Sequence, residues 1–135
     1  MLLSVIVPCY NEESVLRQTH QRLTSVLGQI PDLAHELIYV NDGSVDHTME
    51  ILVQLQASDE SVRVLNLSRN FGHQVAVTAG LENAAGDAVV VIDADLQDPP
   101  EVIPAMVERW REGYHVAYGE RAERAGETGF KLWTA

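Results

Sequence analysis

Two aspartates separated by one residue stand out, because they follow the most continuously apolar run of the sequence. Asp93 and Asp95 come directly after Ala-Val-Val-Val-Ile at 88–92, and Gln97 lies two residues further. Side chains alternate along an extended chain, so these three can share one face if the chain stays extended. Two close carboxylates repel unless a cation lies beside them, and oxygen ligands suit Mg²⁺ or Mn²⁺ better than zinc. The spacing favours a metal or nucleotide site.

Asp98 fits a structural role better than a chemical one. The run Asp98-Pro99-Pro100-Glu101 has a helix N-cap, a proline at the first helical position and an acid at the third. Solvating a turn or capping this helix is also the alternative for Asp93 and Asp95. Because Asp98 already supplies the cap, the sequence favours the metal or nucleotide role for the other two aspartates.

The turn Asn41-Asp42-Gly43-Ser44 leaves two interpretations open. A glycine-containing turn, followed by Asp46 as the N-cap of the next helix, would explain it without any ligand. Alternatively, the Asp42 carboxylate could accept a hydrogen bond from the ring N–H of a nucleobase such as uracil.

A further polar turn, Pro8-Cys9-Tyr10-Asn11-Glu12, follows the first apolar run. Tyr10 could lie against a base, and Glu12 could accept a hydrogen bond from a ribose hydroxyl. Asn11 and Glu13 suit the start of a helix, as a cap and as an acid in the first turn.

Two arginines, Arg69 and Arg121, follow the third and fifth apolar segments. Most exposed arginines are only solvated, and we assign that role to Arg17, Arg22 and Arg63. An arginine at the ligand edge of a strongly acidic protein is different, because its guanidinium can pair with diphosphate oxygens. Arg69 and Arg121 are therefore candidate phosphate-binding residues.

Short apolar segments alternate with helical periodicity along the chain. Continuous apolar runs predict strands, and apolar residues at i, i+3 and i+4 spacing predict helices. The predicted strands are 3–7, 36–40, 62–67, 88–92 and 115–118, and the predicted helices are 15–28, 49–55, 73–85 and 103–110. This alternation predicts one α/β domain over 1–135, with a mostly parallel sheet flanked by helices on both faces.

The order of elements also predicts where a ligand binds. The run at 88–92 is typical of a central strand, and 73–85, apolar nearly all round, of a well-buried helix with Gly86 as its C-cap. In open parallel sheets, ligands bind beyond the carboxyl ends of the strands. All five predicted strands end in polar residues, so we expect five loops at one edge to form a single site.

Composition removes several classes of function. The 135 residues carry 9 Lys and Arg against 20 Asp and Glu, a net charge of −11, which argues against nucleic acid as the main partner. One cysteine excludes an internal disulfide, and we interpret Cys9, Trp110 and the histidines as packing or surface residues. The single lysine, Lys131, does not follow a glycine-rich turn, which excludes a P-loop NTPase. The motif GxSxG of α/β-hydrolases and the motif GxGxxG of the usual dinucleotide sites are both absent, which excludes these two classes.

Three motifs together resemble a known family: Val-Ile-Val-Pro-Cys-Tyr-Asn-Glu-Glu at 5–13, Val-Asn-Asp-Gly-Ser-Val-Asp-His-Thr at 40–48, and Ile-Asp-Ala-Asp-Leu-Gln-Asp-Pro-Pro-Glu at 92–101. They are similar to those of family-2 inverting glycosyltransferases with the GT-A (Rossmann-like) nucleotide-sugar-binding fold. With Leu-Ser-Arg-Asn-Phe-Gly-His-Gln at 67–74, the chain resembles the polyprenyl-phosphate branch, akin to dolichyl-phosphate mannose synthase and bactoprenol glucosyltransferase. The resemblance covers essentially all 135 residues.

The resemblance implies roles for individual positions. It implies that the nucleoside is bound by Pro8, Tyr10, Glu12 and Asp42, and that Asp93 contacts the nucleotide sugar. It also implies that Asp95 and Gln97 bind Mg²⁺ or Mn²⁺ and that Arg121 contacts phosphate. Asp93, Asp95 and Arg121 would carry the catalysis. Asn41 departs from the family, which often has aspartate there, but the following Asp42 keeps the base-contacting position.

The resemblance also implies an activity, the transfer of a sugar with inversion from a nucleoside diphosphate sugar, a UDP-sugar in the first instance, to a polyprenyl phosphate. A phosphomonoester has a second pKa of ~6, so the lipid phosphate is already ionised near neutral pH and needs no general base. Two alternatives stay open: a family-2 transferase with a saccharide hydroxyl acceptor, and a non-catalytic nucleotide-binding module.

Membrane contact is expected only through residues outside this chain. No apolar run approaches the ~20 residues that span a bilayer, and the apolar start lacks the basic residues of a signal peptide. Lipid-using members of the family continue into interfacial and transmembrane helices, so the chain resembles an excised catalytic domain that is soluble by itself. In the complete protein it would act at the cytoplasmic side of the cell membrane.

Overall fold

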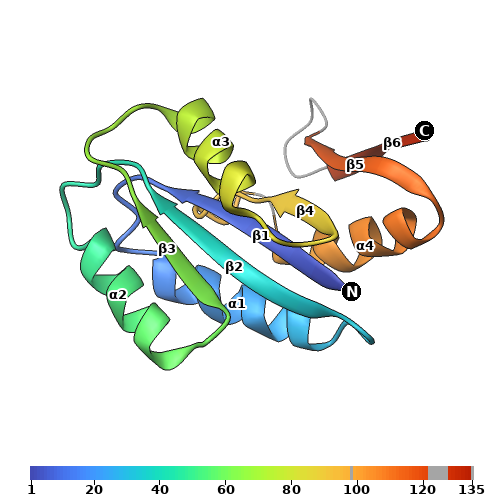
Figure 1. The fold of residues 1–135 in the computed structure, drawn as a ribbon, viewed down its shortest axis with the longest axis horizontal. Helices are drawn as coiled ribbons and strands as arrows, with labels where there is room; N and C mark the ends of the chain where they lie inside the picture. The colour runs from blue at the N-terminus through green and yellow to red at the C-terminus, as the bar shows by residue number, and fades with distance from the viewer. Residues whose placement is uncertain (98, 122–127, 135) are drawn as a thin grey trace.

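Strands and helices alternate along the chain in space as well as in sequence (Figure 1). The computed structural model describes residues 1–97, 99–121 and 128–134, and from residue 114 onward it describes the backbone alone. The elements are β1 (Leu2–Cys9), α1 (Leu16–Gly28), β2 (Ala34–Asn41), α2 (Thr48–Ser58), β3 (Val62–Asn66), α3 (His73–Asn83), β4 (Ala88–Val91), the short 3₁₀ helix η1 (Pro100–Val102), α4 (Ile103–Arg111), β5 (Tyr114–Arg121) and β6 (Thr128–Thr134).

Four parallel strands form the main sheet, in the order β3-β2-β1-β4. β1 lies between β2 and β4, so Val5 stands beside Leu37 on one side and Val90 on the other. Because strands flank β1 and helices cover both of its faces, residues 3–9 are all buried. The predicted α/β architecture is confirmed, and it brings the carboxyl ends of β1, β2 and β4 to one edge.

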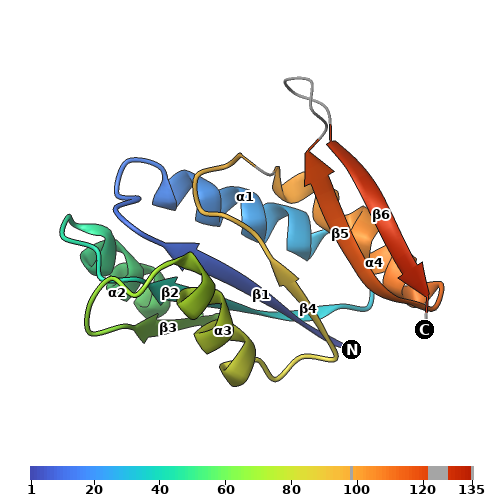
Figure 2. The same ribbon diagram turned by 90° about the horizontal axis from the view of Figure 1, so that it is seen from above.

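Alternation of side chains along the strands divides the core into two clusters. Leu3, Val5 and Val7 of β1 pack with residues of α1, α2 and α4, while Ile6 packs against α3 on the opposite face. Figure 2 shows α1 and α4 on one side of the sheet and α3 on the other. The prediction that helices flank the sheet on both faces is therefore confirmed.

The predicted place of the strand at 88–92 is wrong. Among the described strands β4 lies at an edge of the sheet, and its Val89 and Val91 are 40% and 41% exposed. A continuous apolar run indicates apolar surroundings but does not determine the order of strands. That order depends on which strands pair across the sheet, and β1 and β2 take the central places.

The helix predicted at 73–85 is shorter and less buried than expected. It is α3, whose buried residues are Ala76 and Gly80, because among the described residues only the sheet covers it. At Gly80 an added Cβ would lie 2.5 Å from Cγ2 of Ile6, so the small residue allows this close approach. The helix ends at Asn83, and Gly86 is not its C-cap but lies against Ser4.

The fifth predicted strand does not join the main sheet. β5 pairs with β6 in a separate antiparallel sheet of two strands, which lies beside α4 in both views (Figures 1 and 2). The sequence pattern did not predict β6, and a short strand carries no signal for its pairing partner. The expectation that five strand ends share one edge is wrong, because β5 ends in the other sheet.

The first helix begins differently from its prediction. Asn11 does not cap α1, because its backbone has a φ of 53° and the helix begins only at Leu16. Asp46 does accept a hydrogen bond from the backbone N–H of Thr48, the first residue of α2. The cap predicted at Asp98 lies outside the described residues. None of the described helices has both the length and the apolar character needed to cross a membrane.

Candidate active site

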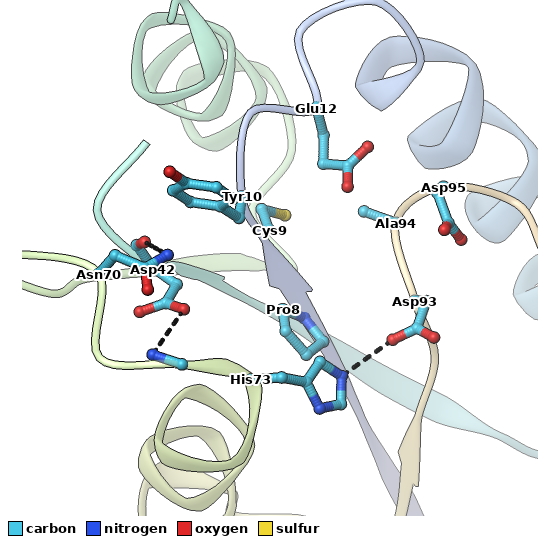
Figure 3. Close-up of a pocket in the computed structure, with 11 residues that line it drawn as sticks. Pro8, Cys9, Tyr10, Glu12, Asp42, Asn70, His73, Asp93, Ala94 and Asp95 are labelled. Carbon is cyan, nitrogen blue, oxygen red and sulfur yellow. Dashed lines mark hydrogen bonds and ion pairs between the residues drawn. The ribbon is translucent and has the colours of Figure 1, made fainter. Parts of the chain in front are cut away.

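A cavity of about 370 Å³ opens at the carboxyl edge of the main sheet (Figure 3). Its walls come from the ends of β1, β2 and β4 and from the segment that joins β3 to α3. The lining residues are Pro8, Cys9, Tyr10, Glu12, Asp42, Asn70, Gly72, His73, Asp93, Ala94 and Asp95. Six residues that the sequence analysis assigned to the site therefore lie around one cavity: Pro8, Tyr10, Glu12, Asp42, Asp93 and Asp95.

Hydrogen bonds between two loops position Tyr10 and Glu12. The backbone N–H of Asn11 donates to Oγ of Ser44 at 3.0 Å, and Oδ1 of Asn11 accepts from the backbone N–H of Val45 at 2.9 Å. The backbone N–H of Glu12 donates to Oγ1 of Thr48 at 2.9 Å. Asn11 therefore joins the loops after β1 and β2 instead of capping α1. Tyr10, 46% exposed, is held with its ring at the cavity.

Asp42 is part of a tight turn and also lines the cavity, so the structural interpretation of its turn is confirmed and the contact with a nucleobase stays a prediction. The residue is 4% exposed, and its two carboxylate oxygens accept hydrogen bonds from the backbone N–H groups of Phe71 and Gly72 at 2.8 and 3.1 Å. Gly43 has a φ of 71°, and an added Cβ would lie 2.2 Å from the backbone nitrogen of Asn70. Only glycine fits there.

Asp93 and Asp95 both line the cavity, but Gln97 is not among the lining residues. The chain turns five residues after the end of β4, where Leu96 has a φ of 62° and the backbone N–H of Gln97 donates to Oδ1 of Asp95 at 3.1 Å. The extended chain that would place all three side chains on one face is therefore absent. The expectation of a shared face is wrong for Gln97, because a turn breaks the alternation of side chains.

Negative charge dominates this end of the cavity. Burial raises the pKa of Glu12, and the charges of Asp95, Asp46 and Asp93 raise it further. The described lining residues include no lysine or arginine. Figure 3 shows the Glu12 carboxylate on the side of the cavity where Asp95 lies. An arrangement of this kind favours a ligand that brings positive charge.

The donor atoms fit a hard divalent cation that binds together with a phosphate ligand. Mg²⁺ is usually held by one or two carboxylates, with water and substrate phosphates completing its shell. Asp95 and Asp93 supply carboxylate oxygens, and among the described residues no group of three acidic, histidine or cysteine side chains forms a ready-made metal cage.

Among the lining residues that were not predicted as site residues, Asn70 and His73 carry polar side chains. Asn70 donates from Nδ2 to the backbone oxygen of Asp42 at 3.2 Å. Nε2 of His73 lies 3.1 Å from Oδ1 of Asp93. The interpretation of the histidines as packing or surface residues holds for His73, whose side chain is 65% exposed, but this surface residue also lines the cavity. The motif at 67–74 contains both residues and was the available signal.

The arginines predicted to bind phosphate lie elsewhere or outside the described side chains. The guanidinium of Arg69 lies 4.2 Å from the ring centroid of Phe71, and Arg69 is not among the lining residues. Arg121 ends β5, where the structure describes the backbone alone. Cys9 is buried, and burial raises the pKa of its thiol, in agreement with a packing role.

With this geometry in place, comparisons with known proteins identify the family. The sequence profile described as "Glycosyl transferase family 2" matches residues 4–135. The chain belongs to glycosyltransferase family 2. The resemblance to these enzymes and the assignment of the chain as part of a transferase are both confirmed.

Curated relatives of the chain include transferases whose names state a polyprenyl acceptor. The chain is 54% identical over 132 residues to the uncharacterized glycosyltransferase YkcC of Bacillus subtilis (strain 168), covering 98% of this chain and 41% of the relative. It is 38% identical to the bactoprenol glucosyl transferase of Shigella phage SfV, covering 100% and 44%. It is 41% identical to the undecaprenyl-phosphate 4-deoxy-4-formamido-L-arabinose transferase of Pseudomonas aeruginosa (strain LESB58), covering 98% and 39%. The chain thus spans less than half the length of these relatives.

Solved structures confirm the GT-A glycosyltransferase fold. S. aureus TarS 1-349 in complex with UDP matches with a TM-score of 0.62 and 26% identity over 84% of this chain and 33% of that chain. The mannosyltransferase PcManGT from Pyrobaculum calidifontis, in complex with GDP-Man and Mn²⁺, matches with a TM-score of 0.67 and 23% identity over 78% and 31%. The second likeness concerns the fold alone.

Proposed function

We propose that this chain is the donor-binding catalytic domain of a metal-dependent inverting glycosyltransferase, which moves a sugar from a UDP-sugar to a polyprenyl phosphate. The observation that carries the proposal is the single cavity with Tyr10 and Asp42 at one end and Asp93 and Asp95 at the other. The names of two relatives, a bactoprenol and an undecaprenyl-phosphate transferase, support the choice of acceptor. The UDP complex of TarS supports the choice of nucleotide.

The residues of the cavity would bind the donor from end to end. The base would lie against Tyr10 and Pro8, with Asp42 at its edge, and Glu12 would accept a hydrogen bond from the ribose. Asp93 would contact the nucleotide sugar. Arg121 and Arg69 would pair with the diphosphate, which would require the segments that carry them to approach the cavity when the donor binds.

Asp95 and Gln97 would hold Mg²⁺ or Mn²⁺, which when bound stabilises negative charge on the departing diphosphate. Asp95 faces the cavity, and the N–H of Gln97 fixes one of its oxygens. The anomeric carbon passes through an oxocarbenium-like transition state, as in glycoside hydrolysis. No described lining residue is needed as a general base, because a lipid phosphate attacks as an anion.

The position of the chain within a longer protein belongs to the same proposal. The chain spans about two fifths of the length of its relatives, and the cavity supports its assignment as their donor-binding part. Segments outside this chain would then supply the acceptor surface and the contact with the cytoplasmic side of the membrane.

Calorimetry with UDP, UDP-glucose and GDP-mannose, each with and without Mn²⁺, tests the proposal. We expect the UDP ligands to bind more tightly when Mn²⁺ is present. Asp95→Asn should remove the effect of Mn²⁺, while Asp87→Asn, at the opposite end of β4, should retain it. Absence of binding by all three nucleotides would contradict donor binding. In the complete protein, transfer to a saccharide hydroxyl but not to a polyprenyl phosphate would contradict the proposed acceptor.

A further inference from the structure

His73 and Asp93 join two separate walls of the cavity. His73 is the first residue of α3, and Asp93 follows β4, so their side chains meet across the space between a helix and the sheet (Figure 3). Nε2 of His73 lies 3.1 Å from Oδ1 of Asp93, and the two side chains are 65% and 42% exposed. Such a partly exposed pair contributes little to stability. The effect of this pair is instead to fix the orientation of the Asp93 carboxylate.

The position of His73 depends in turn on Asp42. The buried Asp42 carboxylate accepts the N–H groups of Phe71 and Gly72, the two residues that directly precede His73. Gly72 has a φ of 104° and is the N-cap of α3. By holding these two N–H groups, Asp42 sets the direction in which α3 begins, and with it the side from which His73 reaches the cavity.

We infer that Asp42 and His73 are positioning residues that act in series: Asp42 holds the turn at 70–72, and His73, at the end of that turn, orients Asp93 toward the donor sugar. This inference rests on the proposed function. Two aspartates so close in sequence repel each other. The hydrogen bond with His73 draws Asp93 toward α3.

The two positioning residues should affect different parts of the donor. Figure 3 shows Tyr10 and Asp42 on one side of the cavity and Asp93 on the other. With the base at Tyr10, Asp93 reaches the sugar but not the nucleoside. Loss of His73 should therefore affect a nucleotide sugar and spare the free nucleotide. Loss of Asp42, which lies at the nucleoside side and also holds the turn, should affect both.

The test compares the binding of UDP and UDP-glucose by calorimetry in the complete protein with Mn²⁺. We expect His73→Ala to weaken UDP-glucose binding about three- to fivefold, the factor of one hydrogen bond, and to leave UDP binding unchanged. His73→Gln keeps an N–H donor and should restore most of the loss. Asp42→Ala should weaken both ligands. Gln74→Ala, the next residue on the same exposed turn and outside the cavity, is the matched control and should change neither.

Several outcomes would overturn the inference. Equal weakening of both ligands by His73→Ala would indicate a general effect on the fold or on the nucleoside site. Unchanged binding of UDP-glucose by His73→Ala would show that His73 does not orient Asp93 for the donor sugar. If Asp42→Ala does not fold, Asp42→Asn, which keeps one acceptor oxygen, replaces it. Unchanged binding of both ligands by the Asp42 variant would show that Asp42 does not position the turn at 70–72 for donor binding.

The unaltered protein separates this inference from the proposed function. If it binds GDP and GDP-mannose in place of the uridine ligands, the same comparison is made with that pair, with the same expected and contradicting results. If it binds no nucleotide, the proposed function fails, and this inference fails with it before any variant is made.

Discussion

Two glutamates near opposite ends of the parallel sheet, Glu36 and Glu12, have opposite surroundings. Near the amino end of β2, Glu36 is 9% exposed and accepts hydrogen bonds from Oγ of Ser4 at 2.6 Å, from the backbone N–H of Ala85 at 2.8 Å and from Nη1 of Arg63 at 3.1 Å. Every acceptor oxygen of Glu36 has a donor. At the carboxyl end, Glu12 lines a cavity together with further carboxylates.

The pKa of each glutamate shows the difference. Burial raises the pKa of Glu36, but the hydrogen bonds from Ser4, Ala85 and Arg63 outweigh burial, and the pKa lies below its ordinary value of 4.5. Burial and then neighbouring aspartates raise the pKa of Glu12 above the same ordinary value. Glu36, whose carboxylate stabilises the fold, has hydrogen-bond donors that offset the cost of its burial. The raised pKa of Glu12 marks the surface where a ligand is expected.

The largest effect should come from Asp95→Asn in the complete protein. Sugar transfer should fall by about a hundredfold or more, because the variant loses a charge that would hold the cation against the departing diphosphate. The unfolding free energy should stay unchanged, since Asp95 stabilises no buried group. Transfer rates with Mn²⁺ and thermal unfolding measure the two results. Asp87→Asn, which keeps an acceptor for the N–H of Leu2, is the control. Full activity in Asp95→Asn would contradict the assignment.

Glu36→Ala should show the reverse pattern. We expect a loss of about 2–3 kcal/mol of unfolding free energy, because the buried hydroxyl of Ser4 and the N–H of Ala85 lose their acceptor. Nucleotide affinity should not change, since Glu36 does not line the cavity. Urea unfolding and calorimetry measure the two. Glu36→Gln keeps one acceptor oxygen and should lose less. A loss below about 0.5 kcal/mol in Glu36→Ala would show that the network does not stabilise the fold.

The smallest effect concerns pH. Because the pKa of Glu12 is raised in the folded protein, ionisation of Glu12 destabilises the fold as pH rises through and above 4.5. The lowered pKa of Glu36 has the opposite sign, and its stabilisation is lost as pH falls below 4.5. Solvent screening limits the Glu12 effect to a few tenths of a kcal/mol.

Urea unfolding of Glu12→Gln at several pH values measures this smallest effect. Relative to the unaltered protein, the variant should gain stability as pH rises, and Mn²⁺ should reduce the gain. A difference that is the same at every pH would contradict the mutual repulsion of these acids, because it would come from a change other than the charge.

The sequence predicted most of the fold and six of the cavity residues, for a local reason. A continuous apolar run such as 3–7 indicates a strand, and the polar residues after it must then lie at the end of that strand. Tyr10, Asp42 and Asp93 could be placed in this way, although their roles stay predictions. The edge position of β4 and the pairing of β5 with β6 could not be predicted in this way. Both depend on which strands come to lie side by side in the folded protein.

His73 shows the same limit at the level of one side chain. A single histidine without metal-ligand spacing gives no signal by itself, and its meaning comes only from the proximity of Asp93, twenty residues further along the chain. Gln97 shows the opposite case. Its spacing predicted that its side chain shares a face with Asp93 and Asp95, but the turn at Leu96 prevents this.

By itself, the amino-acid sequence determined the alternation of strands and helices, the polar character of the strand ends and the family, because these depend on the order and type of neighbouring residues. The tertiary structure decided the strand order, the hold of Asp42 on the start of α3 and the contact between His73 and Asp93. These features are hydrogen bonds and packing contacts between distant segments, and they form only when the sheet brings the ends of β1, β2 and β4 to a common edge.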